Sequence, residues 1–382
     1  MNAFITDIAA FLPNAPVDNN HMEEVLGMVG QVPSRTRKII LRNNGIKQRY
    51  YALDPTSGTF THTNAQLAAQ AIRQLQPFPE FSPAAIECLC CGTSSPDQFM
   101  PGHASMVHGE LGMAKCEVMS TAGICLSGIT ALKYGAMNVA LGNSANAVTT
   151  GSELASSYMR AEFFGRTDPT KVAALEHNPA LSFEADFLRW MLSDGAGAIY
   201  LEPQPRHGKL SLRVDWIEIL SHADELEPCM YAGAIKNPDH SLTGWRQFDS
   251  ITAAIEQGAM PVKQDAKLLN QLVIPTVVDQ TLPRLIKKHG LQPDDITWYL
   301  PHYSSAYFRQ ELYDNMAGID FEIPFSRWFN NLAAKGNTGS ASFYIMLEEL
   351  FHSGRLNKGD RILGFIPESG RFSIGYAQFT VV

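Results

Sequence analysis

Three separated parts of the chain carry side chains that could act together in nucleophilic chemistry, and the first is Cys125. It follows a strand-like run, 116–119, and a turn of small residues, and it precedes a helix-period run over 126–139. A cysteine at a helix entrance faces unpaired backbone N–H groups and the positive end of the helix dipole, which favour the thiolate. Such a thiol can hold an acyl group as a thioester. A buried structural cysteine is the alternative that this segment leaves open.

His302 and Asn337 are the other two candidates. His302 follows Pro301 at the end of the strand predicted over 296–300, and α/β proteins usually build their sites at strand ends. Asn337 precedes a helix-period run that reaches Leu350, and taken alone it would be an N-cap. A lone histidine is more often structural, so neither residue identifies a site without the other segments.

The order of segments around Cys125 recurs around Asn337. In both places a small-residue turn opens a helix, and a turn then leads into a strand, over 147–150 in the first case and 361–365 in the second. If the two halves pack with pseudo-two-fold symmetry, both helix entrances face one cleft. The competing interpretation is that the similarity is incidental, because any α/β chain contains some repeated orders of strand, turn and helix.

Strands and helices alternate along the whole chain, which predicts α/β layers. A helix over 267–289, kinked at Pro275, is the longest that the pattern predicts. The other strands are expected over 3–12, 87–94, 197–201 and 210–220, and the other helices over 20–28, 64–75 and 103–111.

The composition is that of a globular protein with a large core. Of 382 residues, 45% are hydrophobic and 18% are charged, and the formal net charge is −8. This charge argues against a nucleic-acid partner held through phosphates. No apolar run is long enough to span a bilayer and no signal-peptide pattern is seen, so we expect no membrane partner and a cytoplasmic location.

The cysteine pattern predicts neither a disulfide framework nor a metal centre. Six cysteines are too few and too unevenly spread for a secreted scaffold. Cys88, Cys90 and Cys91 lack CxxC spacing and a nearby histidine, so they indicate a buried small-residue strand. No metal and no cofactor is expected.

The ordered set of Cys125, Pro301-His302, the GNTGS sequence at 336–340 and the DGAGA sequence at 194–198 resembles the condensing enzymes of the thiolase fold. The β-ketoacyl-acyl-carrier-protein synthase III branch is the most similar, and the resemblance extends to residues 44–49 and to a degraded closing glycine loop at 368–375.

The resemblance implies an α/β thiolase fold whose duplicated halves give a five-layered α-β-α-β-α architecture. Residues 1–205 would form the half that carries Cys125 and a long cap or dimer segment, 153–193. Residues 206–382 would form the half that carries His302 and Asn337.

The resemblance also implies an acyltransferase mechanism. Cys125 would take an acyl group from a thioester, and a malonyl or β-ketoacyl thioester would supply the carbon nucleophile for a Claisen condensation in fatty-acid or polyketide-type biosynthesis. His302 and Asn337 would stabilise the enolate, and the backbone N–H groups of Cys125 and Gly370 would form the oxyanion hole. Asparagine at 337, with no second cysteine late in the chain, favours the decarboxylative route.

Some positions depart from the family pattern. Ile39 and Asn43 stand where the family has an aromatic residue and an arginine that hold coenzyme A. We therefore expect an acyl carrier protein as the donor in preference to coenzyme A, with Arg309 as a candidate contact because Tyr307 takes the usual arginine position. These departures favour secondary metabolism, and a dialkylresorcinol- or cyclohexanedione-forming type is one refinement.

The segment 153–193 is rich in aromatic and acidic residues that suit a pocket wall. Its candidate pocket residues are Phe163, Phe164, Phe187, Trp190, Glu153 and Glu184. We also expect a homodimer, in which the strand 147–150 pairs across the two-fold axis. Two alternatives remain: an acyltransferase that passes the acyl group to oxygen or nitrogen, and a non-catalytic partner subunit of a ketosynthase heterodimer.

Overall fold

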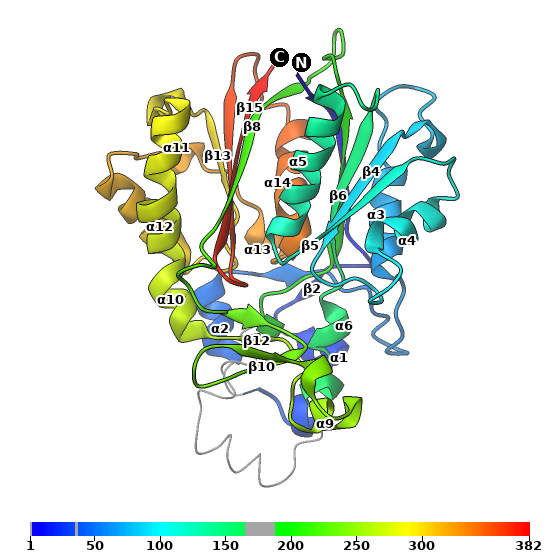
Figure 1. The fold of residues 1–382 in the computed structure, drawn as a ribbon, viewed down its shortest axis with the longest axis vertical. Coiled ribbons are helices and arrows are strands. Elements are labelled where there is room, and N and C mark those ends of the chain that lie inside the picture. Colours follow the sequence, from blue (N-terminus) through cyan, green and yellow to red (C-terminus); the bar gives the residue numbers. More distant parts are fainter. Residues whose placement is uncertain (1, 35–36, 165–187) are drawn as a thin grey trace.

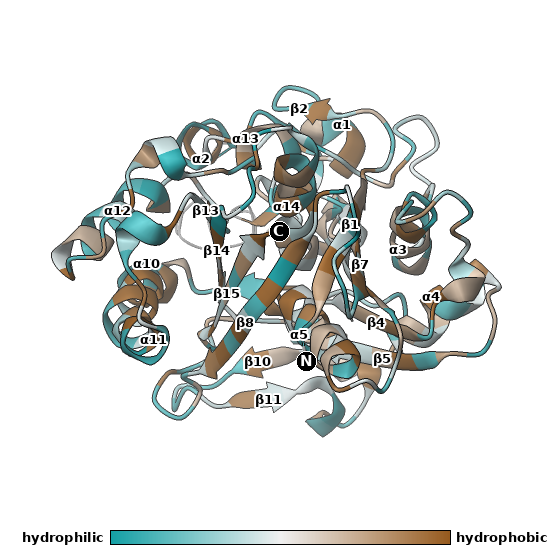
Figure 2. Cartoon of the chain, turned by 90° about the horizontal axis from the view of Figure 1, so that it is seen from above, coloured by the Kyte–Doolittle hydropathy of each residue, from teal (hydrophilic) through white to brown (hydrophobic). Residues whose placement is uncertain are grey.

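The computed structural model describes residues 2–34, 37–164 and 188–382. Its helices and strands form five layers, α-β-α-β-α, so the predicted architecture is confirmed (Figure 1). Helices α5 (Leu126–Ala140) and α14 (Ser342–His352) lie in the middle layer. The view from above places α3 and α4 outside one side of this sandwich and α10, α11 and α12 outside the other (Figure 2).

The strands repeat one pairing pattern in the two halves of the chain. In the first half β4 is parallel to β6, and β6 and β1 both pair antiparallel with β7. In the second half β13 is parallel to β14, and β14 and β8 both pair antiparallel with β15. The two sets join where Phe4 and Ile5 pair with Arg213 and Leu212. The strand order of the resulting nine-stranded sheet is β13-β14-β15-β8-β1-β7-β6-β4-β5.

The bounds of the elements agree closely with those predicted for the regular helices and strands. The first half contains β1 (Phe4–Phe11), β2 (Val17–Asp18), α1 (Met22–Leu26), α2 (Arg37–Asn44), β3 (Gln48–Arg49), α3 (Asn64–Arg73), β4 (Cys88–Thr93), α4 (His103–Leu111), β5 (Glu117–Ala122), β6 (Ala147–Glu153), α6 (Ser156–Met159) and β7 (Gly195–Glu202). The second half contains β8 (Leu212–Ser221), β9 (Met230–Tyr231), β10 (Ala234–Lys236), β11 (Leu242–Gly244), α9 (Ile251–Glu256), β12 (Lys263–Gln264), α10 (Ala266–Pro275), α11 (Leu282–His289), β13 (Trp298–Pro301), α12 (Phe308–Gly318), α13 (Leu332–Lys335), β14 (Arg361–Glu368) and β15 (Ser373–Val381).

Two glycines let α5 pack closely against its neighbours. A Cβ atom on Gly128 would lie 2.2 Å from the carbonyl oxygen of Ser340, and one on Gly135 would lie 2.4 Å from Thr149 Cγ2. A larger residue at position 128 would push the helix away from the loop that carries Asn337. The spacing between the two halves at the site therefore depends on Gly128, whereas Gly135 lets α5 approach β6 within the first half.

The long helix predicted over 267–289 is divided into three parts. Helix α10 ends at Pro275, a π-helical turn covers Thr276–Thr281, and α11 continues to His289. The Thr281 hydroxyl donates to the Thr276 carbonyl at 3.0 Å. Proline cannot donate a backbone hydrogen bond, and the irregular turn after Pro275 is the form that the expected kink takes.

The prediction that the strand 147–150 is an exposed edge is wrong. β6 is buried and pairs with both β4 and β7, so it has no free edge. The two edges of the sheet are β13 and β5, and Val118 on β5 is 37% exposed. The run of small residues in β6 reflects close packing against the loop that contains Ser340.

The segment 222–265, between β8 and α10, was not foreseen as structured. It contains β9, β10, β11, α9 and β12 and lies below the layers, near α1 and α6 (Figure 1). β15 was also missed, because its residues were interpreted only as a closing loop. Short strands and mixed polarity give this part of the chain no clear period.

Candidate active site

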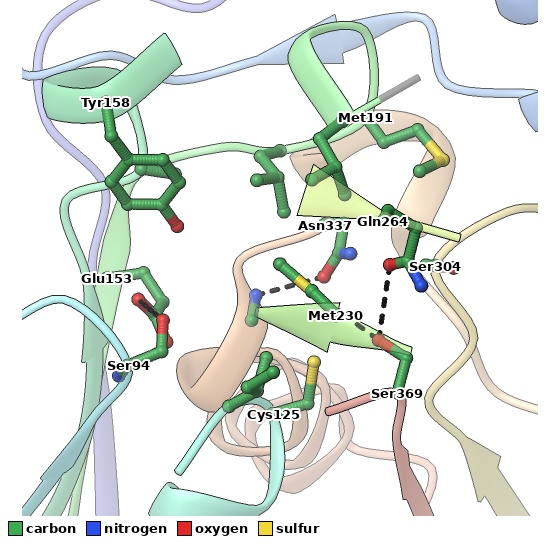
Figure 3. Close-up of a pocket in the computed structure, with 15 residues that line it drawn as sticks. Ser94, Cys125, Glu153, Tyr158, Met191, Met230, Gln264, Ser304, Asn337 and Ser369 are labelled. Atoms are coloured by element: carbon green, nitrogen blue, oxygen red, sulfur yellow. Dashed lines mark hydrogen bonds between the residues drawn. The ribbon is translucent and has the colours of Figure 1, made fainter. Parts of the chain in front are cut away.

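Cys125 lies where β5 turns into α5. Gly123 adopts a positive φ of 149°, and Cys125 is the N-cap residue of the helix. The Ser127 hydroxyl donates to the carbonyl of Ile124 at 2.8 Å and stabilises this turn. The sulfur of Cys125 points into a cavity whose wall also includes Asn337 (Figure 3). A second cavity on the other side of Cys125 is lined by His302.

Asn337 presents an amide donor to the first cavity. Its side-chain Oδ1 accepts the backbone N–H of Gly339 at 3.0 Å. Its own backbone N–H donates to Met191, and its carbonyl accepts the N–H of Ser193. With the backbone and Oδ1 fixed, the Nδ2 group remains as the part of the side chain that can donate to a ligand.

A buried arginine supports the strand-like segment that holds Asn337. The Nε and Nη2 atoms of Arg49 and the Nδ2 atom of Asn44 all donate to the carbonyl of Trp190. Burial lowers the pKa of Arg49 to about 10, so this guanidinium is still charged at neutral pH. The segment at 44–49 that the resemblance included is therefore the anchor of the wall next to Asn337.

His302 follows β13, and its side chain is buried beside Cys125. Its backbone N–H donates to Phe365 on the neighbouring strand at 2.8 Å. Burial lowers the pKa of His302 to about 4, so the imidazole is neutral at physiological pH. A neutral histidine and an asparagine amide are two uncharged donors, as the sequence predicted for this pair.

Glu153 is the candidate pocket acid that the structure brings to the cavity. Its carboxylate accepts the backbone N–H and the hydroxyl of Ser94, the hydroxyl of Ser95 and the backbone N–H of Ser340. Burial raises the pKa of Glu153, against the effect of these donors. The carboxylate therefore ties the loop after β4 to the loop that carries Asn337.

The expectation that the helix entrance lowers the pKa of Cys125 is wrong. Burial raises the pKa of the Cys125 thiol, and the carboxylates of Glu153 and Glu368 raise it further. Glu368 occupies the positive end of α5, where it accepts the N–H groups of Ile124, at 3.0 Å, and Leu126. The resting site thus holds a neutral thiol.

Both cavities are mainly apolar, and the first carries more polar side chains. Its polar side chains include Ser94, Glu153, Tyr158, Gln264, Asn337 and Ser369. The apolar lining of the second includes Leu269, Val273, Ile274, Phe308, Leu312 and Phe365. Cys125, Ser304 and Ser369 belong to both, so a group attached to the sulfur can be reached from either side.

The remaining predicted residues lie in different places. The side chain of Phe163 is 44% exposed and Trp190 is fully buried beside Arg189, and neither lines the two cavities. Gly370 lies beside Ile124, to which a Cβ atom would come within 2.9 Å. Phe187, Glu184 and the side chain of Phe164 are outside the described residues.

Sequence reasoning missed Met230 and Gln264, which lie on the wall of the first cavity opposite Glu153 (Figure 3). Neither stands in a recognisable motif. Cys88, Cys90 and Cys91 form the buried strand that was predicted. Among residues 2–34, 37–164 and 188–382, no group of three or more His, Cys, Asp or Glu could hold a metal ion. In the same part of the chain, no helix could cross a membrane.

Comparison with known proteins agrees with the fold and the order of the motifs. A family profile described as 3-oxoacyl-[acyl-carrier-protein (ACP)] synthase III C terminal matches residues 286–366. The β-ketoacyl-[acyl-carrier-protein] synthase III of Methylococcus capsulatus is 23% identical over 324 residues, 85% of this chain and 84% of its own. The enzyme of the same name from Chlorobaculum tepidum is 22% identical over 365 residues, 95% of this chain and 94% of its own.

Solved structures show the same fold along nearly the whole chain. AbyA1, described as a tetronic acid condensing enzyme, is 21% identical with a TM-score of 0.74, covering 99% of both chains. OleA from Xanthomonas campestris is 19% identical with a TM-score of 0.73, covering 100% of this chain and 97% of its own.

The duplicated fold, with a cysteine at the central helix entrance, is that of the thiolase-fold condensing enzymes. Within that class the chain is similar to the β-ketoacyl-acyl-carrier-protein synthase III enzymes.

Proposed function

We propose that this protein joins two acyl units by a β-ketoacyl synthase III-type Claisen condensation on Cys125. The observation that carries the proposal is the position of Cys125 between two cavities, one lined by Asn337 and the other by His302. A single sulfur reachable from two sides suits a reaction in which one acyl group waits while a second substrate arrives.

In the first half-reaction the Cys125 sulfur attacks the carbonyl carbon of an acyl thioester. The carrier thiolate leaves and takes up the proton that Cys125 loses, so an acyl-cysteine and a free carrier thiol result. The tetrahedral oxyanion would accept hydrogen bonds from the backbone N–H groups of Cys125 and Gly370. These two donors are assigned by resemblance to the family.

In the second half-reaction a malonyl thioester loses CO2, and the electron pair of the broken bond forms an enolate. The neutral side chains of His302 and Asn337 would donate hydrogen bonds to the enolate oxygen, which stabilises the charge as it develops. The enolate carbon then attacks the acyl-cysteine carbonyl, a C–C bond forms, and the Cys125 sulfur leaves. A β-ketoacyl thioester acting as the nucleophile would use the same donors.

We propose an acyl carrier protein as the donor of both substrates. A third cavity, lined by Asn43, Tyr307 and Phe308, shares Phe308 with the second. Tyr307 is 55% exposed, and Arg309, two residues later, is exposed above the ring of Phe325. Asn43 carries no charge for a coenzyme A phosphate, although Tyr307 supplies an aromatic face that the sequence comparison did not anticipate.

The proposal also includes a homodimer, which is typical of the family, and a cytoplasmic location. The edge strand β5 leads directly to Cys125. An edge that stays unpaired is a site of uncontrolled association, so we assign it to pairing with a second copy. The halves 1–205 and 206–382 remain our proposed domain division.

The two half-reactions can be separated by intact mass spectrometry. The protein is incubated first with an acetyl thioester and then with a malonyl-carrier protein, and Cys125→Ala and Cys229→Ala are measured in parallel. We expect acetylation in the wild type and in Cys229→Ala, since Cys229 is buried and lines neither cavity. Malonyl addition should release the acetyl group as a β-ketoacyl product with loss of CO2.

Acetylation of Cys125 without C–C bond formation would instead favour an acyltransferase to oxygen or nitrogen. No acylation of Cys125 from any thioester would favour a non-catalytic subunit. Acylation without C–C bond formation would contradict only the condensation step of the proposal. Absence of acylation would contradict the enzymatic function itself.

A further inference from the structure

The carboxylate of Glu368 connects the closing segment of the chain to the turn that carries Cys125. Glu368 is the last residue of β14, and its side chain reaches the entrance of α5. Its Oε2 atom accepts the backbone N–H of Ile124 at 3.0 Å, and the carboxylate also accepts the N–H of Leu126. Because these two residues flank Cys125, one side chain from the second half of the chain holds both sides of the nucleophile.

Two glycines leave the space that this carboxylate fills. A Cβ atom on Gly123 would lie 3.2 Å from Glu368 Oε2, and a Cβ atom on Gly370 would lie 3.1 Å from Glu368 Oε1. The closing loop, residues 369–372, is itself fixed, because the Gly370 carbonyl accepts the N–H of Cys229 at 2.8 Å. The carboxylate therefore lies in a slot between the nucleophile turn and a fixed loop.

The place of the carboxylate matters because N–H groups at a helix entrance normally stabilise a thiolate. Here the N–H groups of Ile124 and Leu126 are directed at Glu368. A thiolate on Cys125 would have to share these donors with the carboxylate, and the two negative charges would repel each other. The entrance of α5 thus favours an anion that is already present in the protein.

The surroundings of the sulfur supply no positive charge that would offset this carboxylate. The titratable side chains that face the entrance of α5 from the elements around it are Glu153, Tyr158, His302, Tyr344 and Glu368. Glu153 is a second carboxylate, and His302 is neutral because burial lowers its pKa to about 4. Among the described residues that line the two cavities there is no lysine or arginine.

We propose that Glu368 is a positioning residue that fastens the closing loop to the nucleophile turn, and whose negative charge keeps Cys125 in the neutral, weakly reactive thiol form between turnovers. The inference rests on the proposed function, because it concerns the nucleophile of that reaction. It assigns a role to a residue that lines neither cavity. A thioester held in the cavities then reacts with the sulfur, whereas small electrophiles that diffuse in react slowly.

The test measures the alkylation of Cys125 at neutral pH by iodoacetamide, which is uncharged, and by iodoacetate, which is an anion of similar size. The proteins are the wild type, Glu368→Gln, which keeps the shape of the side chain, and Glu368→Ala, which places no new donor against the backbone N–H groups. Glu256→Gln, at an exposed position in α9, is the matched control for the change in net charge. Cys116 is the internal reference in each protein, and melting temperatures show whether each variant is folded.

Removal of a nearby negative charge lowers the pKa of a thiol by about one unit or more, which is about tenfold in the thiolate fraction. Because a less basic thiolate is also less nucleophilic, we expect the rate of Cys125 with iodoacetamide, relative to Cys116, to rise about threefold in both Glu368 variants. The rate with iodoacetate should rise by a larger factor, since the anionic reagent no longer meets the carboxylate. Glu256→Gln should match the wild type.

An unchanged rate of Cys125 in folded Glu368 variants would overturn the inference. An equal increase with the two reagents would also overturn it, because a loosened loop exposes the sulfur to both reagents alike. Loading of Cys125 from the acetyl thioester of N-acetylcysteamine is measured on the same samples. Absence of acylation in the wild type would contradict the proposed function, whereas the ratio of the two alkylation rates tests the charge of Glu368 by itself.

Discussion

The Oε1 atom of Glu153 accepts the backbone N–H of Ser340 at 3.1 Å, although the two residues come from opposite halves of the chain. The same carboxylate holds Ser94 and Ser95 in the loop after β4. Gly151 approaches the Ser340 carbonyl so closely that a Cβ atom would lie 2.3 Å from it. The loop that presents Asn337 is thus fixed by contacts with the first half.

Replacing Glu153 with alanine should weaken both folding and condensation. The variant lacks the acceptor of the buried Ser94 and Ser340 backbone N–H groups. Leaving a buried donor unsatisfied costs about 1–3 kcal/mol. Thermal melting and the condensation rate would be compared with Glu162→Ala, which replaces an exposed residue whose side chain is 75% accessible. Equal stability of the two variants would contradict the tie between the halves.

Replacing Asn337 with aspartate should abolish condensation while the fold remains intact. An aspartate oxygen can still accept the Gly339 N–H, but the Nδ2 donor becomes an acceptor that repels an enolate. Loss of one oxyanion donor costs roughly a hundred- to a thousand-fold in rate. Acylation of Cys125 should persist, which single-turnover mass spectrometry can check. Asn315→Asp, in α12 and away from the cavities, is the control.

The sequence predicted the elements and residues that have a strong local signal. The 3.6-residue period of 126–139 became α5, and the helix predicted over 64–75 became α3, which a capping box of Thr63 and Gln66 opens. The predicted catalytic residues Cys125, His302 and Asn337 each stand in a short motif, and the structure places them at the two cavities. The ordered set of motifs also indicated the duplicated fold, which the repeated strand pairing confirms.

The features that the sequence did not predict depend on contacts between residues far apart in the chain, which no local pattern contains. Met230 and Gln264 reach the cavity only because β9 and β12 pair across a gap in sequence. The pKa of Cys125 follows from burial and from the Glu368 carboxylate, a residue far along the chain. β6 looked like an edge because its residues are small, whereas their size allows the approach of the Ser340 loop.

Acid should affect stability through His302. Its pKa is about 4 in the folded protein and 6.5 for a histidine that is fully exposed to water, so the unfolded chain binds the proton first as pH falls. The stability that the buried neutral ring contributes is fully present above pH 6.5 and is lost between pH 6.5 and about pH 4. Because each unit of pKa shift corresponds to 1.36 kcal/mol, the free energy of unfolding should fall by about 3 kcal/mol over this range.

This prediction can be checked against His302→Asn by chemical denaturation across that range. The wild-type protein should lose more free energy of unfolding than the variant as pH falls. Burial raises the pKa of Asp194 to about 6, so its contribution to the free energy of unfolding changes with pH in the opposite direction. Because that contribution is the same in both proteins, it cancels in the comparison. A constant difference between the two proteins would mean that His302 is accessible and ionises normally.

The two half-reactions should respond differently to alkali. Because the pKa of the Cys125 thiol is raised, the rate of acyl transfer should increase with pH throughout the neutral and mildly alkaline range. Decarboxylation from preformed acyl-enzyme should be nearly independent of pH there, since His302 stays neutral. Separate pre-steady-state measurements on the two steps test this, and a shared pH profile would contradict it.

Alkylation should distinguish Cys125 from the other cysteines. Cys125 and Cys116 are partly exposed, whereas Cys88, Cys90, Cys91 and Cys229 are buried. Iodoacetamide should therefore modify only these two thiols in the folded protein, and faster as pH rises because burial raises the pKa of both. Prior incubation with an acetyl thioester should protect Cys125 and leave Cys116 reactive, as peptide mapping would show. Modification of Cys125 after acetylation would place the acyl group elsewhere.

The edge strand β5 gives the last prediction, which concerns assembly. Val118 is an apolar residue on the outermost strand of the sheet and is 37% exposed in the single chain. A lysine at this position would place a charge on the pairing edge, and charged residues on edge strands oppose association. Val118→Lys should therefore shift a dimer toward monomer in light scattering at micromolar concentration. Val32→Lys, a 61% exposed position remote from β5 in sequence, is the control and should leave the dimer unchanged. A monomeric wild type, or a dimer in both variants, would show that β5 is not the interface.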